Sequence, residues 1–236
     1  MPVSFTLLAA IALAADPGAA DDAFRPSGVF AQARSEEVVR LVYPNWDAAT
    51  GITRDGSSWR AHLDQARTWK TPDGERLAVL LGLWSGDPDE RWTTAANGTL
   101  FCDLVLIRRA GDRLELEARA KRAVPCGGAT TSRLDLAPYR MDERTLLLGV
   151  RSESMNHGYG EVTLALFRLE GHALRSVFSR VMETSDANTA GMPGTSATLT
   201  VETHPPDPSV FRVVEKRGRI EVVERWAWAG TQYLKQ

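Results

Sequence analysis

The chain has 236 residues but only two cysteines and four histidines, and it has almost no excess of charge. Its 28 basic and 30 acidic residues give a net charge of -2, which offers no electrostatic basis for binding nucleic acid or an anionic membrane. The sequence also lacks the patterns G-x-S-x-G, S-x-x-K, H-E-x-x-H and D-x-D-x-D-G, and no Gly-rich phosphate loop opens a helix. These absences argue against the familiar hydrolase, calcium-loop and nucleotide sites, and we expect no cofactor and no metal.

A long hydrophobic run is also missing. The apolar stretch from Val3 to Ala15 is shorter than the roughly 20 residues that a membrane-spanning helix needs. Ala12-Leu13-Ala14 fits an A-x-A cleavage site, although no Lys or Arg precedes the run as in an ordinary leader. We expect residues 1–20 to be a signal peptide and linker, no transmembrane segment, and export to the periplasm or the medium.

The remaining residues 21–236 are long enough for one β-rich domain, and two short helices are expected before its strands, between about 35 and 70. Ser35 is placed to cap the first helix, which Pro44 should end. The second is expected to begin at Ser57 or Ser58.

In that second segment Trp59, Leu63 and Ala66 recur at the i, i+4, i+7 spacing of a helical face. Because short isolated helices are marginal in water, both helices should lie against the sheet.

Strand patterns joined by glycine turns fill the chain from about 76 to 236, and the clearest hairpin spans Glu161 to Met182. Turns are expected at Gly111, Gly171 and Gly218, since glycine readily takes the positive φ of a tight turn.

The side chains predict the register of the first two hairpins. A three-residue loop from Arg109 to Gly111 places Leu106 opposite Leu114 on the paired strand. A two-residue loop would instead place Leu106 opposite Glu115. We therefore predict the three-residue loop, because it keeps apolar side chains opposite each other. A three-residue loop ending at Gly171 likewise places Leu166 opposite Leu174 and Val162 opposite Phe178. For the third hairpin, at Gly218, the side-chain pattern favours neither loop length.

The first arm of the central hairpin is apolar on both faces. Val162, Leu164 and Leu166 point one way, and Ala165 and Phe167 the other, which predicts a strand buried on both sides. The fold class is therefore mainly β, an antiparallel meander or β-sandwich of Gly-turn hairpins with one or two short N-terminal helices. A propeller-like repeat is the alternative, because the hairpin glycines lie roughly one blade length apart.

Cys102 and Cys126 are predicted to form a disulfide, since an even, small number of cysteines is typical of exported proteins. The predicted register places Ala118 opposite Cys102, so Lys121 to Gly128 must fold back to bring the two cysteines together. A metal site is not expected from two cysteines without a C-x-x-C pattern.

The loop from Asn156 to Glu161 is the first candidate for a site. His157 can exchange a proton near neutral pH, Glu161 can orient it, and Tyr159 can position a substrate. The competing interpretation is that the glycines shape a turn, His157 is solvated and Glu161 caps a strand. The other histidines are interpreted as surface residues.

A second candidate is the acidic loop between Trp84 and Trp92, where exposed indole rings can stack on sugars or cations. The competing interpretation is that both rings pack at strand ends.

The leading hypothesis is an exported, non-catalytic β-rich protein that binds an unknown protein or glycan ligand in the cell envelope. The alternative is a hydrolase of an envelope polymer that uses His157 and Glu161 as acid and base. A third hypothesis, a structural subunit of a larger assembly, would need an exposed apolar patch near Trp226.

Overall fold

The computed structural model describes residues 24–54, 58–85, 101–127, 129–186, 194–202 and 208–236. It contains a single turn of 3-10 helix, η1 (Gly28–Phe30), and one α-helix, α2 (Ser35–Val42), within these residues. The strands are β1 (Phe24–Arg25), β2 (Ile52–Arg54), β3 (Ser58–Thr71), β4 (Gly74–Ser85), β5 (Phe101–Ala110), β6 (Arg113–Pro125), β7 (Thr130–Arg140), β8 (Leu146–Asn156), β9 (Tyr159–Glu170), β10 (Ala173–Asp186), β11 (Thr195–Glu202), β12 (Val210–Arg217), β13 (Ile220–Trp228) and β14 (Tyr233–Lys235).

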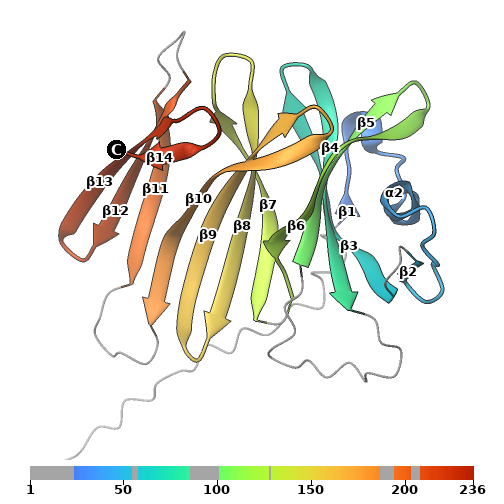
Figure 1. Cartoon of the computed structure of the whole chain (residues 1–236), viewed down its shortest axis with the longest axis horizontal. Coiled ribbons are helices and arrows are strands. Elements are labelled where there is room, and N and C mark those ends of the chain that lie inside the picture. Colours follow the sequence, from blue (N-terminus) through green and yellow to red (C-terminus); the bar gives the residue numbers. More distant parts are fainter. Residues whose placement is uncertain (1–23, 55–57, 86–100, 128, 187–193, 203–207) are drawn as a thin grey trace, which may run out of the picture.

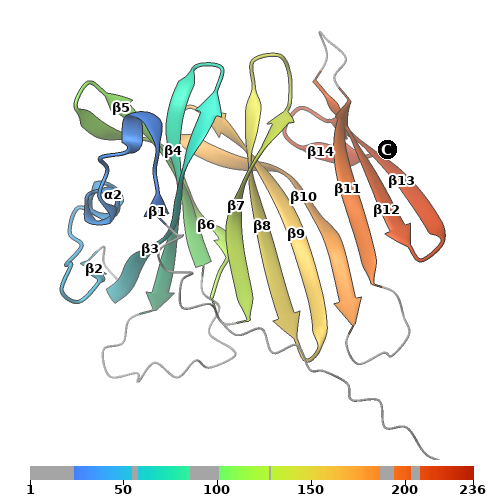
Figure 2. The same ribbon diagram turned by 180° about the vertical axis from the view of Figure 1, so that it is seen from behind.

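The described strands form one continuous, mostly antiparallel sheet of 14 strands (Figures 1 and 2). Its path runs β1-β3-β4-β5-β6-β10-β11-β12-β13-β14, while β7, β8 and β9 extend from β10 as a second branch. The two branches meet where β6 and β10 pair in parallel through Arg119 and Ala173. The expected mainly β fold is thus confirmed, although the parallel pairings of β1 with β3 and of β6 with β10 make the sheet a mixed one. The propeller-like alternative is wrong, because a propeller needs separate four-stranded blades around a channel.

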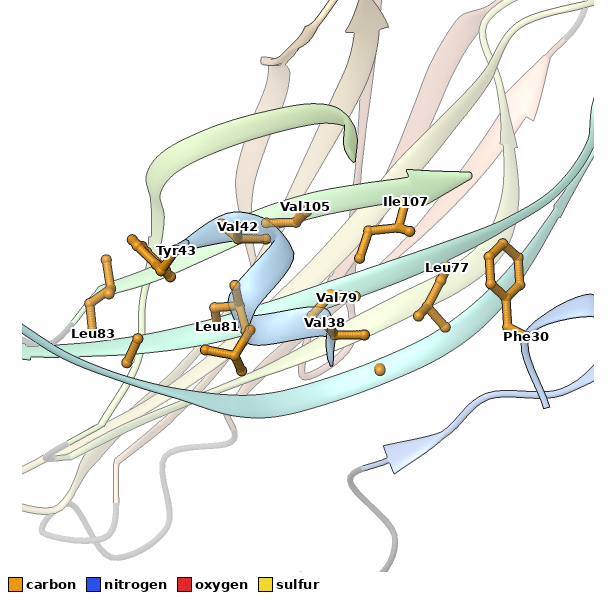
Figure 3. Packing of buried hydrophobic residues seen from close by; sticks show 13 residues of the cluster. Phe30, Val38, Val42, Tyr43, Leu77, Val79, Leu81, Leu83, Val105 and Ile107 are labelled. Carbon is orange, nitrogen blue, oxygen red and sulfur yellow. The ribbon is translucent and has the colours of Figure 1, made fainter. Parts of the chain in front are cut away.

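The outer layer of the core lies between η1, α2 and one face of the sheet from β3 to β6 (Figure 3). Phe30 from η1 and Val38 from α2 are fully buried in this layer. The helix therefore covers apolar sheet surface, as expected for a short helix. The side chains of β4 and β5 in the layer are Leu77, Val79, Leu81, Leu83, Val105 and Ile107.

The middle layer lies between β3 to β6 and the branch of β7 to β10. On β4, Ala78 and Leu80 face this layer, so the strand is buried on both sides. Leu148 and Val150 of β8 and Phe167 of β9 close the layer from the other branch. We call the sheet surfaces that bound this layer the inner face.

A third layer lies between β8 to β10 and the strands β11 to β14. Leu164 and Leu166 of β9 are buried in it, while Ala165 and Phe167 face the middle layer. The prediction of a strand buried on both sides is therefore confirmed.

The terminal arm of the chain closes the third layer. The ring of Tyr233 stacks on that of Phe211 with centroids 4.0 Å apart. Trp226 lies edge-on to Phe178 with centroids 5.1 Å apart, so its ring packs on the third layer.

The helix expected at Ser35 is present, with a shifted cap. Ser35 is its first helical residue, and the N-cap is Arg34, which makes no side-chain capping hydrogen bond. Glu36 and Glu37 lie in the first turn, where carboxylates favour the helix dipole, and the helix ends before Pro44.

The prediction of a second helix is wrong, because its residues belong to β3. A bulge between Leu63 and Gln65 shifts the alternation by one residue. Ala61 and Leu63 before it and Ala66 after it all contact the outer layer. A bulged strand therefore imitates the spacing of a helical face.

The predicted hairpin registers are also wrong. Ala110 pairs with Arg113 and Glu170 with Ala173, so each loop has two residues, of which the glycine is the first. The φ values of 60° at Gly111 and 58° at Gly171 fit a type II′ turn, in which the second loop residue keeps a negative φ.

β-Bulges in both hairpins still bring apolar side chains opposite each other, which was the reason for predicting a three-residue loop. In the first hairpin Leu106 pairs with Ala118, one position beyond a register shift. In the central hairpin Leu166 pairs with Phe178, again beyond a shift. The bulges shift the register, so apolar side chains face each other although each turn has only two residues.

The two cysteines lie at the distance of a disulfide bond, with sulfur atoms 2.14 Å and Cα atoms 5.7 Å apart. Leu104 pairs with Ala120 but Cys102 with Val124, so the extra residues of β6 form a bulge. The fold-back expected of Lys121 to Gly128 is therefore wrong, because β6 continues to Pro125, which pairs with Phe101, and the shifted register itself brings Cys126 to Cys102.

Candidate functional site

The candidate residues around His157 lie at one end of the β8–β9 hairpin. Asn156 pairs with Tyr159, and His157 and Gly158 form the two-residue turn between them with φ values of 48° and 87°. Positive φ at both positions is the geometry of a type I′ turn. Tyr159 is 46% exposed, and the carboxylate of Glu161 accepts a 3.2 Å hydrogen bond from the Thr163 hydroxyl.

Trp84 lies near the end of β4, where its backbone pairs with Arg60. Trp92 lies outside the described residues, so the acidic loop between the two tryptophans stays a prediction. In Figure 1 β4 and β8 end on the same side of the sheet, which we call the lower end.

A histidine–aspartate pair lies on the inner face towards the lower end. Nε2 of His62 is 3.9 Å from Oδ1 of Asp64, with side chains 37% and 36% exposed. The imidazole ring occupies the space that a β-carbon on Gly82 would fill, since that atom would lie 2.0 Å from Cε1 of His62. Gly82 follows Ala78 and Leu80 in the alternation of β4, and this places the ring on the inner face.

Burial shifts the titration of both groups towards their neutral forms. It lowers the pKa of His62, against a hydrogen bond with the Gly82 backbone that raises it. It also raises the pKa of the Asp64 carboxyl. A neutral imidazole offers one hydrogen-bond donor and one acceptor.

The amide of Gln65 connects this pair to the second branch of the sheet. Its Oε1 accepts a 3.0 Å hydrogen bond from the backbone N–H of Leu134, which joins β3 to β7. We call His62, Asp64 and Gln65 the inner-face site.

Two buried serines lie further along β7 and β8. Ser132 donates to the carbonyl of Pro125 at 2.6 Å, so Ser152, 2.7 Å away, donates to Ser132. The two hydroxyls hydrogen-bond to each other and to the carbonyl at the end of β6, which indicates a structural role.

A buried network below α2 holds the outer layer together. Asp103 on β5 is fully buried, and its Oδ2 accepts hydrogen bonds of 2.7 Å from both the Tyr43 hydroxyl and Nε of Arg119. Its Oδ1 accepts from the backbone N–H of Arg122, also at 2.7 Å. Burial, and then the Asp103 charge, raise the pKa of Tyr43. The network fixes the end of α2 on the sheet.

A second network repeats this chemistry on β7 and β8. Oδ2 of Asp135 accepts from the Tyr139 hydroxyl at 2.8 Å and from Nε of Arg151 at 2.7 Å. Burial and the hydrogen bond to Asp135 raise the pKa of Tyr139 to about 12. Both networks satisfy their buried polar atoms internally, which indicates a structural role.

A third network joins β10 to the last strands. Arg180 donates to Glu224 and to Glu215, each at 2.7 Å, and Lys235 donates to Glu224 at 2.8 Å. The hydrogen bond from Arg180 lowers the pKa of Glu224 to about 2, against the effect of burial. Its charges are paired with each other, so it too is a structural feature.

A surface hollow of about 710 Å³ lies beside η1 and the tips of two hairpins. There the N–H of Val29 donates to Glu75 at 3.1 Å, and Arg109 donates to the Val29 carbonyl at 2.5 Å. These two side chains hold the segment before α2 against the sheet.

Within the described residues no group of three or more His, Cys, Asp or Glu side chains is arranged to hold a metal ion. No helix in this part of the chain is both long and apolar enough to cross a membrane.

Sequence reasoning missed the inner-face site because it placed His62 on a helix. The available signal was the spacing of His62 and Asp64, which places two polar residues close together on a strand. Comparison with protein families, curated proteins and solved structures finds no match to this chain.

Proposed function

We propose that the protein is an exported, non-catalytic binding module of the cell envelope and that its ligand binds at the inner-face site. The observation that carries this proposal is the partly exposed pair of His62 and Asp64 beside the apolar residues of the middle layer. Polar groups lose hydration when they approach an apolar layer, so a folded domain gains little from them there. Both side chains are more than one-third exposed, so a ligand can reach them and hydrogen-bond to them.

Export is supported by two independent features. The apolar run from Val3 to Ala15 has the length and small-residue ending of a signal peptide. Cys102 and Cys126 lie at the distance of a disulfide bond, and disulfides persist mainly in oxidising compartments.

Binding is favoured over hydrolysis because the two residues on which hydrolysis would depend have structural roles. The hydrolase alternative rests on His157 and Glu161, and it requires both side chains to act on one substrate. His157 shapes a type I′ turn, and Glu161 accepts a hydrogen bond from Thr163. These contacts support a structural part for that turn.

A thermal-shift screen of the purified chain tests the proposal, with envelope glycans, peptidoglycan fragments, peptides and divalent metals as ligands. A ligand at 100 times its dissociation constant stabilises by about 2.7 kcal/mol, or roughly 5 to 10 °C for a domain of this size. We expect Asp64→Asn to reduce the shift and His157→Ala to retain it. A shift that is lost only in His157→Ala, or no shift with any ligand, would contradict the proposal.

A further inference from the structure

We propose that the outer edge of β13 is an interface through which two copies of the chain pair into one longer sheet. β13 lies at the outer border of the sheet in both views (Figures 1 and 2). β14 covers that border only from Trp226 to Trp228, and the Gln236 N–H bonds the Arg225 carbonyl. We call the remaining residues, 220–224, the open edge.

The open edge presents backbone hydrogen-bonding groups in the direction of a further strand. The Arg225 carbonyl accepts from Gln236, so it points away from β12. In an antiparallel pairing every second residue directs its N–H and C=O to the same side. The groups of Glu221 and Val223 therefore also point outwards, and no strand in the described part of the chain pairs with them there.

The side chains along this edge are largely apolar and exposed. Ile220 is 65% exposed and Val223 48% exposed. Glu221 is the single exposed charged residue of the five, because Glu224 is held by Arg180. Exposed apolar residues of this kind are typical of an interaction surface.

Other outer edges of the sheet are protected against such pairing, whereas this one is not. β1 and β2 cover the outer side of β3. β7 contains Pro138, and its Leu134 N–H is bonded by Gln65. Proline, short covering strands and bulges are the usual protection of an edge. Residues 220–224 contain no proline, and their pairing with β12 shows no register shift.

The register that the edge allows is complementary to itself, which identifies a second copy as the occupant. Two copies related by a two-fold axis pair antiparallel, and the axis passes through one residue, since opposed side chains lie on the same face. An axis at Glu221 would oppose two carboxylates. An axis at Val223 would place Glu221 of the second copy against Arg225, where Gln236 already lies.

An axis at Val222 meets neither obstacle. It opposes Glu221 of one copy to Val223 of the other, and these are the residues whose backbone groups point outwards. Each of the two pairs exchanges two hydrogen bonds, so the interface gains four. Glu221 also lies diagonal to Arg225 of the second copy, at a spacing that a long side chain spans.

The dimer should be weak and concentration-dependent. Five residues a side bury less than the roughly 800 Å² per partner of a standard stable interface. The small net charge of -2 adds little repulsion between copies.

Sedimentation equilibrium of the purified chain, from about 5 µM to about 1 mM, tests the proposal across the range of weak association. We expect the weight-average mass to rise towards that of a dimer. A monomer at every concentration would overturn the proposal.

Val223→Pro tests the edge, because it removes an outward N–H without removing a bond to β12. We expect the variant to stay monomeric over the same range, with the wild-type urea midpoint. The matched control Val223→Thr keeps the N–H and should dimerise like the wild type. Dimerisation of folded Val223→Pro would place the interface elsewhere.

A cysteine series tests the register independently of that variant. The Cα atoms of two opposed Val222 residues would lie about 4.5 Å apart, within the range of a disulfide. Under air oxidation Val222→Cys should therefore cross-link two copies, whereas Glu221→Cys and Val223→Cys should not. A cross-link that forms best at position 221 or 223, or at none of the three, would overturn the proposed pairing.

Discussion

Arg119 donates a hydrogen bond of 2.7 Å from Nε to Oδ2 of Asp103, a carboxylate that is fully buried on β5. The same oxygen accepts from Tyr43 at the end of α2, and the Arg119 guanidinium lies 4.5 Å from the Tyr43 ring centroid. One charge pair thus connects the helix to two strands of the sheet.

Removing the cation should destabilise the fold strongly. Arg119→Met leaves Asp103 buried without its charge partner, and breaking a buried pair in this way costs about 3–5 kcal/mol. Urea unfolding measures the effect. The control is Arg108→Met, which breaks the exposed pair with Glu115 and should cost less than about 1 kcal/mol. Equal losses in the two variants would contradict the structural role of the network.

Reduction of Cys102 and Cys126 should lower thermal stability. The cysteines are 24 residues apart, and a bond that closes such a loop contributes about 3 kcal/mol. The loss corresponds to a melting temperature lower by roughly 6 to 12 °C for a domain of this size. A thiol assay on the unreduced, denatured chain checks the bond itself, and two free thiols would refute it.

Glu224 should make stability depend on acidic pH. Its pKa is lowered from 4.5 to about 2 by the hydrogen bond from Arg180, so the ionised form is favoured in the folded state. Its contribution is present above pH 4.5 and is lost as the pH falls towards 2. Urea midpoints across this window should decline less steeply in Glu224→Gln than in the wild type.

The exposed neighbour Glu221 on the same strand provides the control for Glu224. Glu221→Gln should keep the wild-type slope. If Glu224→Gln kept it too, the contribution assigned to the Arg180 hydrogen bond would be wrong.

Gly82→Ala should destabilise the chain by displacing the His62 ring. The new β-carbon would lie 2.0 Å from Cε1 of His62, and overpacking of this kind costs about 1–3 kcal/mol. In a His62→Ala background the same change should cost much less, because the clash is gone. A double-mutant cycle measured by urea unfolding gives this coupling, and additive losses would show that the two residues do not touch.

The class of fold could be predicted from alternation, whereas registers could not. The apolar residues on both faces of 162–169 correctly indicated a strand between two layers. The register at Gly111 failed because opposed apolar residues were assumed to require regular strands. The structure opposes them through bulges, which leave no local signal in the sequence.

The inner-face site failed to emerge for the same reason. The bulge between Leu63 and Gln65 gives β3 the spacing of a helix, and a helix would not connect His62 to β4. Only the strand pairing places its ring over Gly82 and beside Asp64. The loop predicted from Asn156 to Glu161 contains the turn at His157 and Gly158, but its other residues belong to β8 and β9.

The most direct test of the proposed site is NMR chemical-shift mapping of the isotope-labelled chain during titration with the screened ligand that gives the largest thermal shift. We predict that the largest shifts occur at His62, Asp64 and Gln65 and that β11 to β14 remain unchanged. Shifts confined to the β8–β9 turn or to the last four strands would contradict a ligand site on the inner face.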